Sequence, residues 1–267
     1  MSGDIYTHGH QEAVLRSHRW RTAENSAAYL LPRLSPGQRV LDVGCGPGTL
    51  TVDLARLVAP GEVIGVDVAA SVVDEARAHA ASLSVANAHF VAGDFRAAAL
   101  EPSSFDVVHA HQVLQHLQDP VGALAAMAKL ARPGGLVAAR DSDYSAFTWS
   151  PHDPHLKRWR EIYLAVTRTN GAEPDAGRWL LRWAHRAGLD AVTYTSSTWT
   201  FATPADRVWW AGVWADRCVS SLFARQAVEY GITTDGDLAT ISEGWKRWAD
   251  DADAVFVVVH GEILADV

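Results

Sequence analysis

Three glycines within five residues follow a short apolar run in the stretch RVLDVGCGPGTLTVDLA, residues 39–55. The apolar run predicts a strand, and the residues after the glycines predict a helix. Glycine is costly in regular structure because it loses the most backbone freedom on folding and has no side chain to pack. A glycine cluster between a strand and a helix therefore indicates a bound group that approaches the backbone closely, where the N–H groups and the positive end of the helix meet.

Strand and helix signals alternate along the first half of the chain. Apolar, β-rich runs predict strands at residues 39–44, 62–68, 88–95, 105–114 and 136–143. Helical patterns lie between them at residues 48–59, 71–83 and 119–131, and Ser71 is the expected N-cap of the second helix. Short strands separated by helices predict βαβ units, which form a parallel sheet with helices on both faces.

The composition changes after Asp143, because ten of the 11 tryptophans lie from Trp149 onward. Helical patterns there fill residues 153–170, 176–187, 204–229 and 237–249, and strand-like runs lie at 191–201 and 255–264. We therefore expect an α/β fold with a Rossmann-like, seven-stranded, mostly parallel sheet, helices on both faces, and a helical cap inserted late in the chain. The expected parts are an N-terminal helical segment that covers the bound group (1–36), a core (37–143 with 176–202 and 251–267), and a cap (144–175 and 203–250).

Charge and cysteine content narrow the classes of partner. The formal net charge of −8 argues against a nucleic-acid groove, which normally brings a basic surplus. Cys45 and Cys218 are the two cysteines, and their wide separation indicates a reducing compartment and no metal site. The N-terminus has no apolar signal core, and no run reaches the roughly 18 apolar residues of a membrane span. We expect a cytoplasmic monomer or homodimer with no nucleic-acid or membrane partner.

Two kinds of ligand compete for the glycine turn. A dinucleotide site needs G-x-G-x-x-G/A, and Gly44 and Gly46 fit this pattern, but its third position falls on Thr49. The pattern present is D-x-G-x-G-x-G, formed by Asp42, Gly44, Gly46 and Gly48. It resembles motif I of the class I S-adenosylmethionine-dependent methyltransferases, in the small-molecule branch that includes the ubiquinone and menaquinone biosynthesis types.

The resemblance covers residues 37–145 and extends over four motifs in order. VIGVD ends in Asp67, where this family places an acid on the ribose hydroxyls, and a carboxylate can accept two hydrogen bonds from a cis-diol. VAGDF contains Asp94, which in this family faces the adenine amino group. FDVVHAHQVLQHLQDP resembles the fourth-strand motif, and LARPGGLVAARD resembles the segment that leads into the fifth strand. The resemblance implies S-adenosyl-L-methionine as the cofactor.

The resemblance also implies roles for individual residues. The backbone of Gly44 is expected on the methionine ammonium, and Gly46 and its neighbours let the cofactor pass close to the chain. Val68 is expected to pack on the adenine, with Phe95 as a second contact. The backbone around His111 is expected to face the methionyl end.

Tyr6 and Arg21 lie on the N-terminal segment, where similar leading helices cover the cofactor and bind its carboxylate. For both residues an ordinary structural role is an equal alternative. Asp67 and Asp94 have the alternative of capping a turn. Cys45 occupies a variable slot of a loop that binds through its backbone, so we do not expect it to act as a nucleophile.

The acceptor side contains a histidine cluster. Methyl transfer to a hydroxyl uses a base, and histidine suits that role near neutral pH. His109 and His111 share one face of a strand, and we expect His109 to be a buried strand residue. His116 follows one turn into the next helix, at the methyl end of the cofactor, and is the first catalytic candidate, with surface packing as its alternative.

Aspartates and tryptophans complete the expected acceptor site. Asp141 and Asp143 lie at the carboxyl end of the fifth strand, where ligands gather in open α/β sheets. Asp141 is the second catalytic candidate. Asp141 and Asp143 together can bind an amine of the acceptor, and a metal is the less favoured ligand because we find too few further metal-binding residues. Trp149, Trp209 and Trp210 are expected to line an apolar acceptor pocket, with ordinary core packing as the alternative.

Two functions follow from these expectations. The first is a methyltransferase that moves a methyl group from S-adenosylmethionine to an O, N or C atom of a small, largely apolar metabolite. The second is a cofactor-binding protein of the same fold that does not methylate, either a regulatory module or a cyclase-like catalyst.

Overall fold

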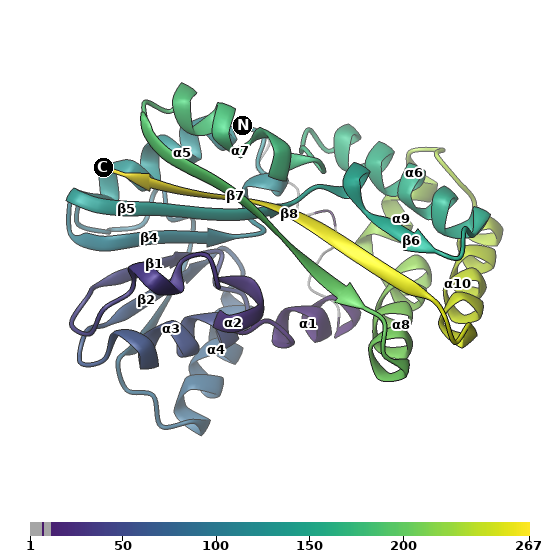
Figure 1. Cartoon of the computed structure of the whole chain (residues 1–267), viewed down its shortest axis with the longest axis horizontal. Helices are drawn as coiled ribbons and strands as arrows, with labels where there is room; N and C mark the ends of the chain where they lie inside the picture. Colours follow the sequence, from purple (N-terminus) through teal and green to yellow (C-terminus); the bar gives the residue numbers. More distant parts are fainter. Residues whose placement is uncertain (1–6, 8–11) are drawn as a thin grey trace.

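One mixed sheet runs through the molecule (Figure 1). The computed structural model describes residue 7 and residues 12–267. The strands follow the order β3-β2-β1-β4-β5-β8-β7, and the short β6 pairs with the first residues of β8. The strands are β1 (Val40–Val43), β2 (Val63–Asp67), β3 (Ala88–Ala92), β4 (Phe105–His111), β5 (Ala131–Ser142), β6 (Thr148–Ser150), β7 (Ala191–Phe201) and β8 (Val255–Asp266).

Strands β1 to β5 pair in parallel, whereas β8 runs antiparallel to β5, β6 and β7. The predicted α/β fold with a seven-stranded, mostly parallel sheet is therefore confirmed, and β6 is an additional short strand. Helices cover both faces of the sheet (Figure 1). The helices are α1 (Glu12–Arg19), α2 (Ala23–Ser26), α3 (Thr49–Val58), α4 (Ala70–Ser82), α5 (Pro120–Leu130), α6 (Pro154–Thr169), α7 (Ala176–Arg186), α8 (Pro204–Ser220), α9 (Leu222–Glu229) and α10 (Asp235–Asp250), with short 3-10 turns η1 (Leu31–Arg33), η2 (Leu114–His116) and η3 (Tyr144–Ala146).

All four residues of β1 are buried because helices press on both of its faces. Val40 belongs to the cluster that includes Leu54 of α3, whereas its neighbour Leu41 belongs to the cluster of α5 and α7. Successive side chains of a strand point to opposite faces, so the VLDV run supplies apolar side chains to both layers. This double burial explains why the strand reads as a nearly continuous apolar run.

The carboxyl ends of β1, β2 and β4 meet at one edge of the sheet. The register places Val43 opposite Val66 of β2 and Ala110 of β4. The connections from β1 lead to β2 on one side, while β4 pairs with it on the other, which makes this edge a topological switch point. The chain leaves the sheet there at Gly44 and after His111, so the expected ligand-binding residues converge at this edge.

Three predicted boundaries were wrong for local physical reasons. Strand β4 ends at His111 because Gln112 has a φ of 54°, a left-handed conformation that no strand continues. Helix α4 begins at Ala70, ahead of Ser71, and the Asp67 carboxylate accepts the N–H of Ala69 at 3.0 Å. The helical run 204–229 is broken at Ser221, which has extended backbone and caps α9.

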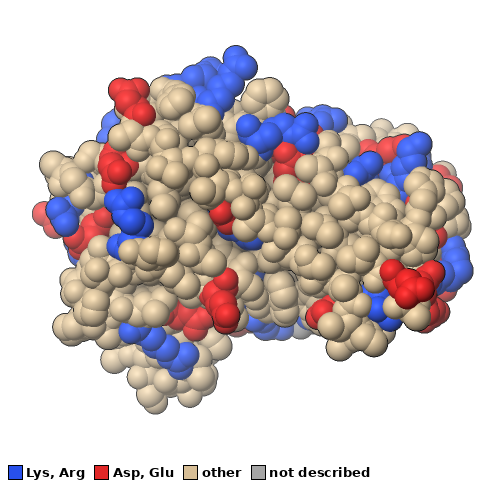
Figure 2. Space-filling model, viewed as in Figure 1, with Lys and Arg blue, Asp and Glu red and all other residues tan. Residues whose placement is uncertain are grey.

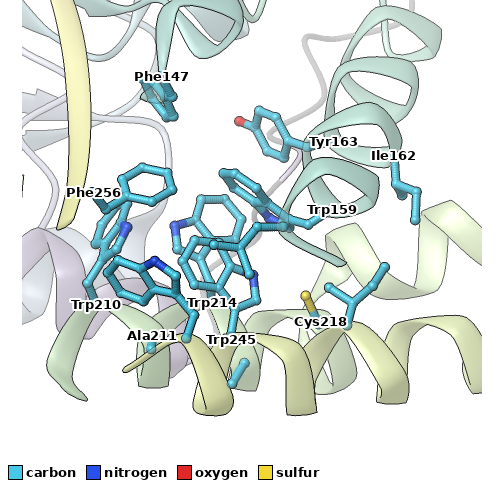
Figure 3. Packing of buried hydrophobic residues seen from close by; sticks show 14 of the residues in the cluster. Phe147, Trp159, Ile162, Tyr163, Trp210, Ala211, Trp214, Cys218, Trp245 and Phe256 are labelled. Atoms are coloured by element: carbon cyan, nitrogen blue, oxygen red, sulfur yellow. The ribbon is translucent and has the colours of Figure 1, made fainter. Parts of the chain in front are cut away.

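A second core fills the space between α6, α8, α10 and the first half of β8. Trp159, Trp214 and Trp245 are fully buried and turn toward one another from the three helices (Figure 3). The rings of Trp159 and Trp214 lie 4.4 Å apart at 67°, and those of Trp159 and Trp245 lie 5.0 Å apart at 80°. These edge-to-face contacts suit the positive edge and negative face of aromatic rings. Most tryptophans of the late segments are therefore core residues.

Figure 2 shows charged side chains of both signs interspersed around one face of the molecule, with no continuous basic stripe on that face. No helix in the described part of the chain is long and apolar enough to cross a bilayer. The assignment of residues 144–175 and 203–250 to a cap stays a prediction, and β7 and β8 run continuously from the sheet into the aromatic core.

Replacing Trp159 by Ala should lower the free energy of unfolding by about 3–5 kcal/mol, because the deletion leaves a cavity among rings that cannot collapse. Urea denaturation measures this change. Trp179→Ala is the matched control, since Trp179 on α7 is 36% exposed, and it should cost less than about 1 kcal/mol. Equal costs for the two variants would show that the aromatic cluster is not a tightly packed core.

Candidate active site

A cavity of about 640 Å³ opens at the edge where β1, β2 and β4 end. Its wall includes the glycine turn after β1, the end of β2 and the residues around Gly93 and His111. This volume lies within the range of small-molecule and cofactor sites. The cavity therefore has the position and the size that a ligand of the glycine turn requires.

The glycine turn has a shape that only glycine allows. Gly44, Gly46 and Gly48 all have positive φ, at 68°, 54° and 80°. A Cβ at Gly46 would project into open space, with its nearest neighbour, His18 Nδ1, at 3.8 Å. A side chain there would fill the cavity, whereas at Gly48 it would collide with Ala76 and Phe90. The turn thus forms a backbone cradle that fits a ligand in close approach.

Asp42, the third residue of β1, holds the start of this turn in place. One carboxylate oxygen accepts the hydroxyl of Thr51 on α3 at 2.6 Å, and the other contacts His109 Nδ1 on β4 at 2.9 Å. Asp42 and His109 are buried, and Asp42 also contributes to the cavity wall. The carboxylate joins β1, α3 and β4, so its local role is to hold the turn in place.

Asp67 lies at the end of β2 and faces the cavity. Its Oδ2 accepts the N–H of Gly46 at 3.1 Å and its Oδ1 accepts the N–H of Ala69 at 3.0 Å. These two bonds fix the carboxylate in one orientation. Each oxygen has a second lone pair, so the fixed carboxylate can still accept hydrogen bonds from a diol.

The next part of the wall is apolar. Val68 is 69% exposed, and Phe95 is buried, yet both line the cavity. An exposed valine beside a buried phenylalanine provides a surface for a flat ring. Asp94 also lines the cavity, and its carboxylate is bound by Arg96 at 2.7 Å, which with other Arg96 hydrogen bonds lowers the pKa of Asp94.

His111 and Arg21 close the opposite side of the cavity. The His111 ring is only 4% exposed, and neither ring nitrogen has a hydrogen-bond partner among the described residues. Burial, with the nearby positive charge of Arg21, lowers the pKa of His111 well below 6.5, so the ring is neutral. Arg21 Nη2 donates to Gln112 Oε1 at 2.5 Å.

A second cavity adjoins the first and encloses about 30 Å³. We call it the aromatic cavity, and its wall is mostly aromatic. The aromatic residues of the wall are Trp20, Tyr144, Phe147, Trp199, Trp209, Trp210 and Trp214. Four residues, His18, Arg21, Gln112 and His116, line both cavities. The two spaces therefore share one boundary.

The structure brings two of the three predicted acceptor tryptophans to the aromatic cavity. Trp209 and Trp210 line it, whereas Trp149 lies outside both cavities. The Trp149 ring stacks on Phe256 at 5.6 Å, and Arg160 lies over its other side at 4.8 Å from the ring centre. Tyr6 falls outside the described residues.

The two predicted catalytic residues occupy different places. His116 lines both cavities, and burial together with the charges of Arg21 and Arg217 lowers its pKa to about 3. Asp141 is fully buried behind η2 and lines neither cavity. Its Oδ1 accepts the N–H of Gln115 at 3.2 Å, and burial raises its pKa to about 7.

Several wall residues had no signal in the sequence. Gln112 follows β4, and its side chain contacts Arg21, Ser142 and His260. Arg217 comes from α8, about two turns beyond the predicted Trp210, and reaches the wall through long-range packing. Gln112 reaches the wall because its backbone is left-handed, and a sequence does not reveal that conformation. No cluster of His, Cys, Asp and Glu within the described residues can hold a metal ion.

Comparison with known proteins identifies the family. A methyltransferase domain family matches residues 34–188. An uncharacterized methyltransferase of Schizosaccharomyces pombe is 34% identical over 278 residues, which span 97% of this chain and 95% of that protein. A ubiquinone biosynthesis O-methyltransferase of Xanthomonas campestris pv. campestris is 42% identical over 108 residues, which span 40% of this chain and 44% of that protein.

Among solved structures, Haemonchus contortus phosphoethanolamine N-methyltransferase 2 in complex with S-adenosyl-L-methionine has the same fold. The TM-score is 0.56 at 18% identity, over 90% of this chain and 51% of that chain. The family match spans more than half of the chain. It therefore favours the methyltransferase pattern of Asp42, Gly44, Gly46 and Gly48 over the dinucleotide pattern, and methyl transfer over a protein that only binds the cofactor. The chain belongs to the methyltransferase domain family as a class I enzyme of EC 2.1.1.-, and its cofactor is S-adenosyl-L-methionine.

Proposed function

We propose that this enzyme methylates a small, largely apolar acceptor that binds in the aromatic cavity. The observation that carries the proposal is the boundary where His18, Arg21, Gln112 and His116 line both cavities. In-line displacement needs reacting atoms about 3–3.5 Å apart, which two adjoining cavities allow and two separated sites do not. The aromatic wall suits an apolar acceptor because it desolvates the reacting atoms.

We propose that the cofactor binds the cradle through the residues that match its family's motifs. Asp67 would accept the ribose hydroxyls, and the backbone of Gly44 and Gly46 would contact the methionyl end. Val68 and Phe95 would hold the adenine. The open space over Gly46 and the fixed Asp67 carboxylate support this arrangement. S-adenosylmethionine supplies an activated methyl group when bound, so the protein's tasks are to bind it, to orient it and to exclude water.

Arg21 and His111 would complete the methionyl end. Arg21 is the cation of the shared boundary, and it would bind the cofactor's carboxylate. His111 is neutral and lines the cavity, and neither ring nitrogen has a hydrogen-bond partner among the described residues, so the ring can donate one hydrogen bond and accept another. Asp94 on the adenine stays a proposal in competition with its Arg96 pair, and Tyr6 stays a prediction.

We assign different roles to His116 and Asp141. His116 is neutral at pH 7 and lines the boundary, so it can exchange a hydrogen bond with the acceptor, whereas its pKa of about 3 makes it a weak base. Asp141 is a positioning residue, because it acts through the N–H of Gln115 and so holds η2, which presents His116. The enclosed volume of about 30 Å³ admits a ring-sized acceptor only after side chains at the rim move, and Trp20 and Trp209 are partly buried there.

The acceptor proposal is tested by Trp209→Ala, with formation of S-adenosylhomocysteine measured against a panel of small hydroxylated, amine and apolar acceptors. Removing this wall should raise the acceptor KM by roughly fivefold, and leave cofactor affinity within about twofold, because one aromatic contact is worth about 1 kcal/mol. Trp149→Ala is the matched control, since its ring lies outside both cavities. If both variants only lower the melting temperature, the aromatic cavity is structural.

Asp67→Ala should weaken S-adenosylhomocysteine binding by about 2 kcal/mol or more, roughly thirtyfold, because the ribose hydroxyls lose a charged acceptor. Calorimetry measures the affinity. Asp67→Asn, which keeps one oxygen toward the Gly46 N–H, should fall between Ala and wild type. Asp74→Ala on the exposed face of α4 is the control. Unchanged affinity in a folded Asp67→Ala protein would mean that this acid serves only the turn.

Asp141→Asn should change how stability depends on pH. The folded pKa of about 7 lies above the ordinary aspartate pKa of 3.8, so wild type loses stability as pH rises between these values. Asn has no such charge to bury. The free energy of unfolding of Asp141→Asn relative to wild type should therefore rise by up to about 1.4 kcal/mol per pH unit from pH 5 to 7. Urea denaturation at several pH values measures it, and a constant difference would contradict a desolvated carboxyl.

A further inference from the structure

Among the described residues, the polar side chains that line the aromatic cavity include arginines but no negatively charged residue. Its described wall contains cations, hydroxyls, amides and imidazoles, and it contains no carboxylate. The charged or titratable members are His18, Arg21, His116, Tyr144 and Arg217. A site for an amine normally offers a carboxylate or a face of negative charge to an ammonium. This wall instead offers hydrogen-bond donors and positive charge.

The neighbouring carboxyls are directed elsewhere. Asp143 accepts Arg178 at 2.5 Å and caps η3 through the N–H of Ala146. Asp141 stays behind η2, bonded to the backbone of Gln115. Glu262 pairs with Arg140 at 3.0 Å within the sheet. None of the three lines the cavity, so an amine bound there would not meet their oxygens.

The positive charge of the wall acts on two of its titratable groups, His116 and Tyr144. Arg217 is 4% exposed, donates to Ser17 Oγ at 2.5 Å and lies 4.9 Å from the centre of the Trp214 ring, so it is held at the wall. Burial lowers the pKa of His116, and Arg21 and Arg217 lower it further. Burial raises the pKa of Tyr144, and the same two arginines oppose that rise. The field therefore favours an oxyanion and disfavours a cation.

We propose that the acceptor is a planar hydroxylated ring, a phenol or an enol, that reacts as its oxyanion, and that the cavity selects against amines. The inference rests on the proposed acceptor site. The hydroxyl proton is released to water as the acceptor binds as its oxyanion, and neutral His116 lines the boundary as a hydrogen-bond partner rather than as the base. An oxygen electron pair then forms the bond to the methyl carbon, and the electron pair of the carbon–sulfur bond stays on sulfur. The flat ring packs among Trp199, Trp209 and Trp210.

The test uses the enzyme loaded with S-adenosylhomocysteine and two probes of similar size, 4-nitrophenol and 4-nitrobenzylamine. The absorbance of 4-nitrophenol reports its ionisation directly, so this readout does not depend on turnover. In wild type the pKa of bound 4-nitrophenol should fall by about one unit below its value in water, and it should bind at least about tenfold more tightly than the amine.

Arg217→Met should return the pKa of the bound probe toward its value in water, whereas Arg217→Lys, which keeps the charge, should preserve most of the shift. Arg182→Met is the control, since the exposed Arg182 of α7 lies over the Trp179 ring, outside both cavities. Melting temperatures check folding, and if Arg217→Met does not fold, Arg21→Met at the boundary of the two cavities replaces it.

The possible outcomes separate this inference from the acceptor site itself. Tighter binding of 4-nitrobenzylamine, or a raised or unchanged pKa of bound 4-nitrophenol in wild type, overturns the oxyanion and leaves the aromatic cavity as an acceptor site. If neither probe binds while S-adenosylhomocysteine binds normally, both the inference and the proposed acceptor site are wrong. A lowered pKa that Arg217→Met removes supports the inference.

Discussion

The buried ion pair between Arg140 of β5 and Glu262 of β8 connects the parallel part of the sheet to its antiparallel part. These residues lie opposite each other in the antiparallel register, and their side chains meet at 3.0 Å. Desolvation opposes such a pair unless further hydrogen bonds satisfy the charges. Ser197 and Thr195 of β7 supply them to Glu262, and burial lowers the pKa of Arg140 only to about 10, so it stays charged. A slip of any of the three strands would leave a buried charge unpaired, so the pair specifies their register.

The same network fixes the boundary between the cavities. Arg140 Nη2 contacts His260 Nδ1 at 3.0 Å, His260 Nε2 contacts Gln112 Nε2 at 2.9 Å, and Gln112 Oε1 accepts Arg21. The left-handed backbone of Gln112 turns this side chain from the end of β4 into the network. In the proposed arrangement, the methyl donor and the acceptor would meet at a boundary that the sheet holds in place. Rigid support of this kind is what positional catalysis requires.

The cofactor side could be predicted from the sequence because its residues are local. Gly44 and Gly46 lie in the turn after β1 and Asp67 ends β2, and parallel strands bring their carboxyl ends to one edge. The acceptor side depends on packing between segments far apart in the chain. Arg217 and Trp199 meet there from α8 and β7, while Trp149, equally plausible by composition, packs outside. Asp141 lies at the expected strand end, but only the fold shows that its carboxyl turns behind η2.

Burial at η2 acts on its two titratable residues with opposite sign. Asp141 has a folded pKa of about 7 against an ordinary pKa of 3.8, so its contribution to the free energy of unfolding falls as pH rises through that interval. His116 has a folded pKa of about 3 against an ordinary histidine pKa of 6.5. Its contribution to the free energy of unfolding therefore falls as pH decreases from 6.5 to 3. Between about pH 4 and 6.5 the two slopes oppose each other, and both side chains are neutral in the folded protein. Desolvation thus keeps both His116 and Asp141 uncharged in mildly acid conditions, and above pH 7 Asp141 adds one negative charge behind Gln115, which would weaken the positive field proposed for the oxyanion.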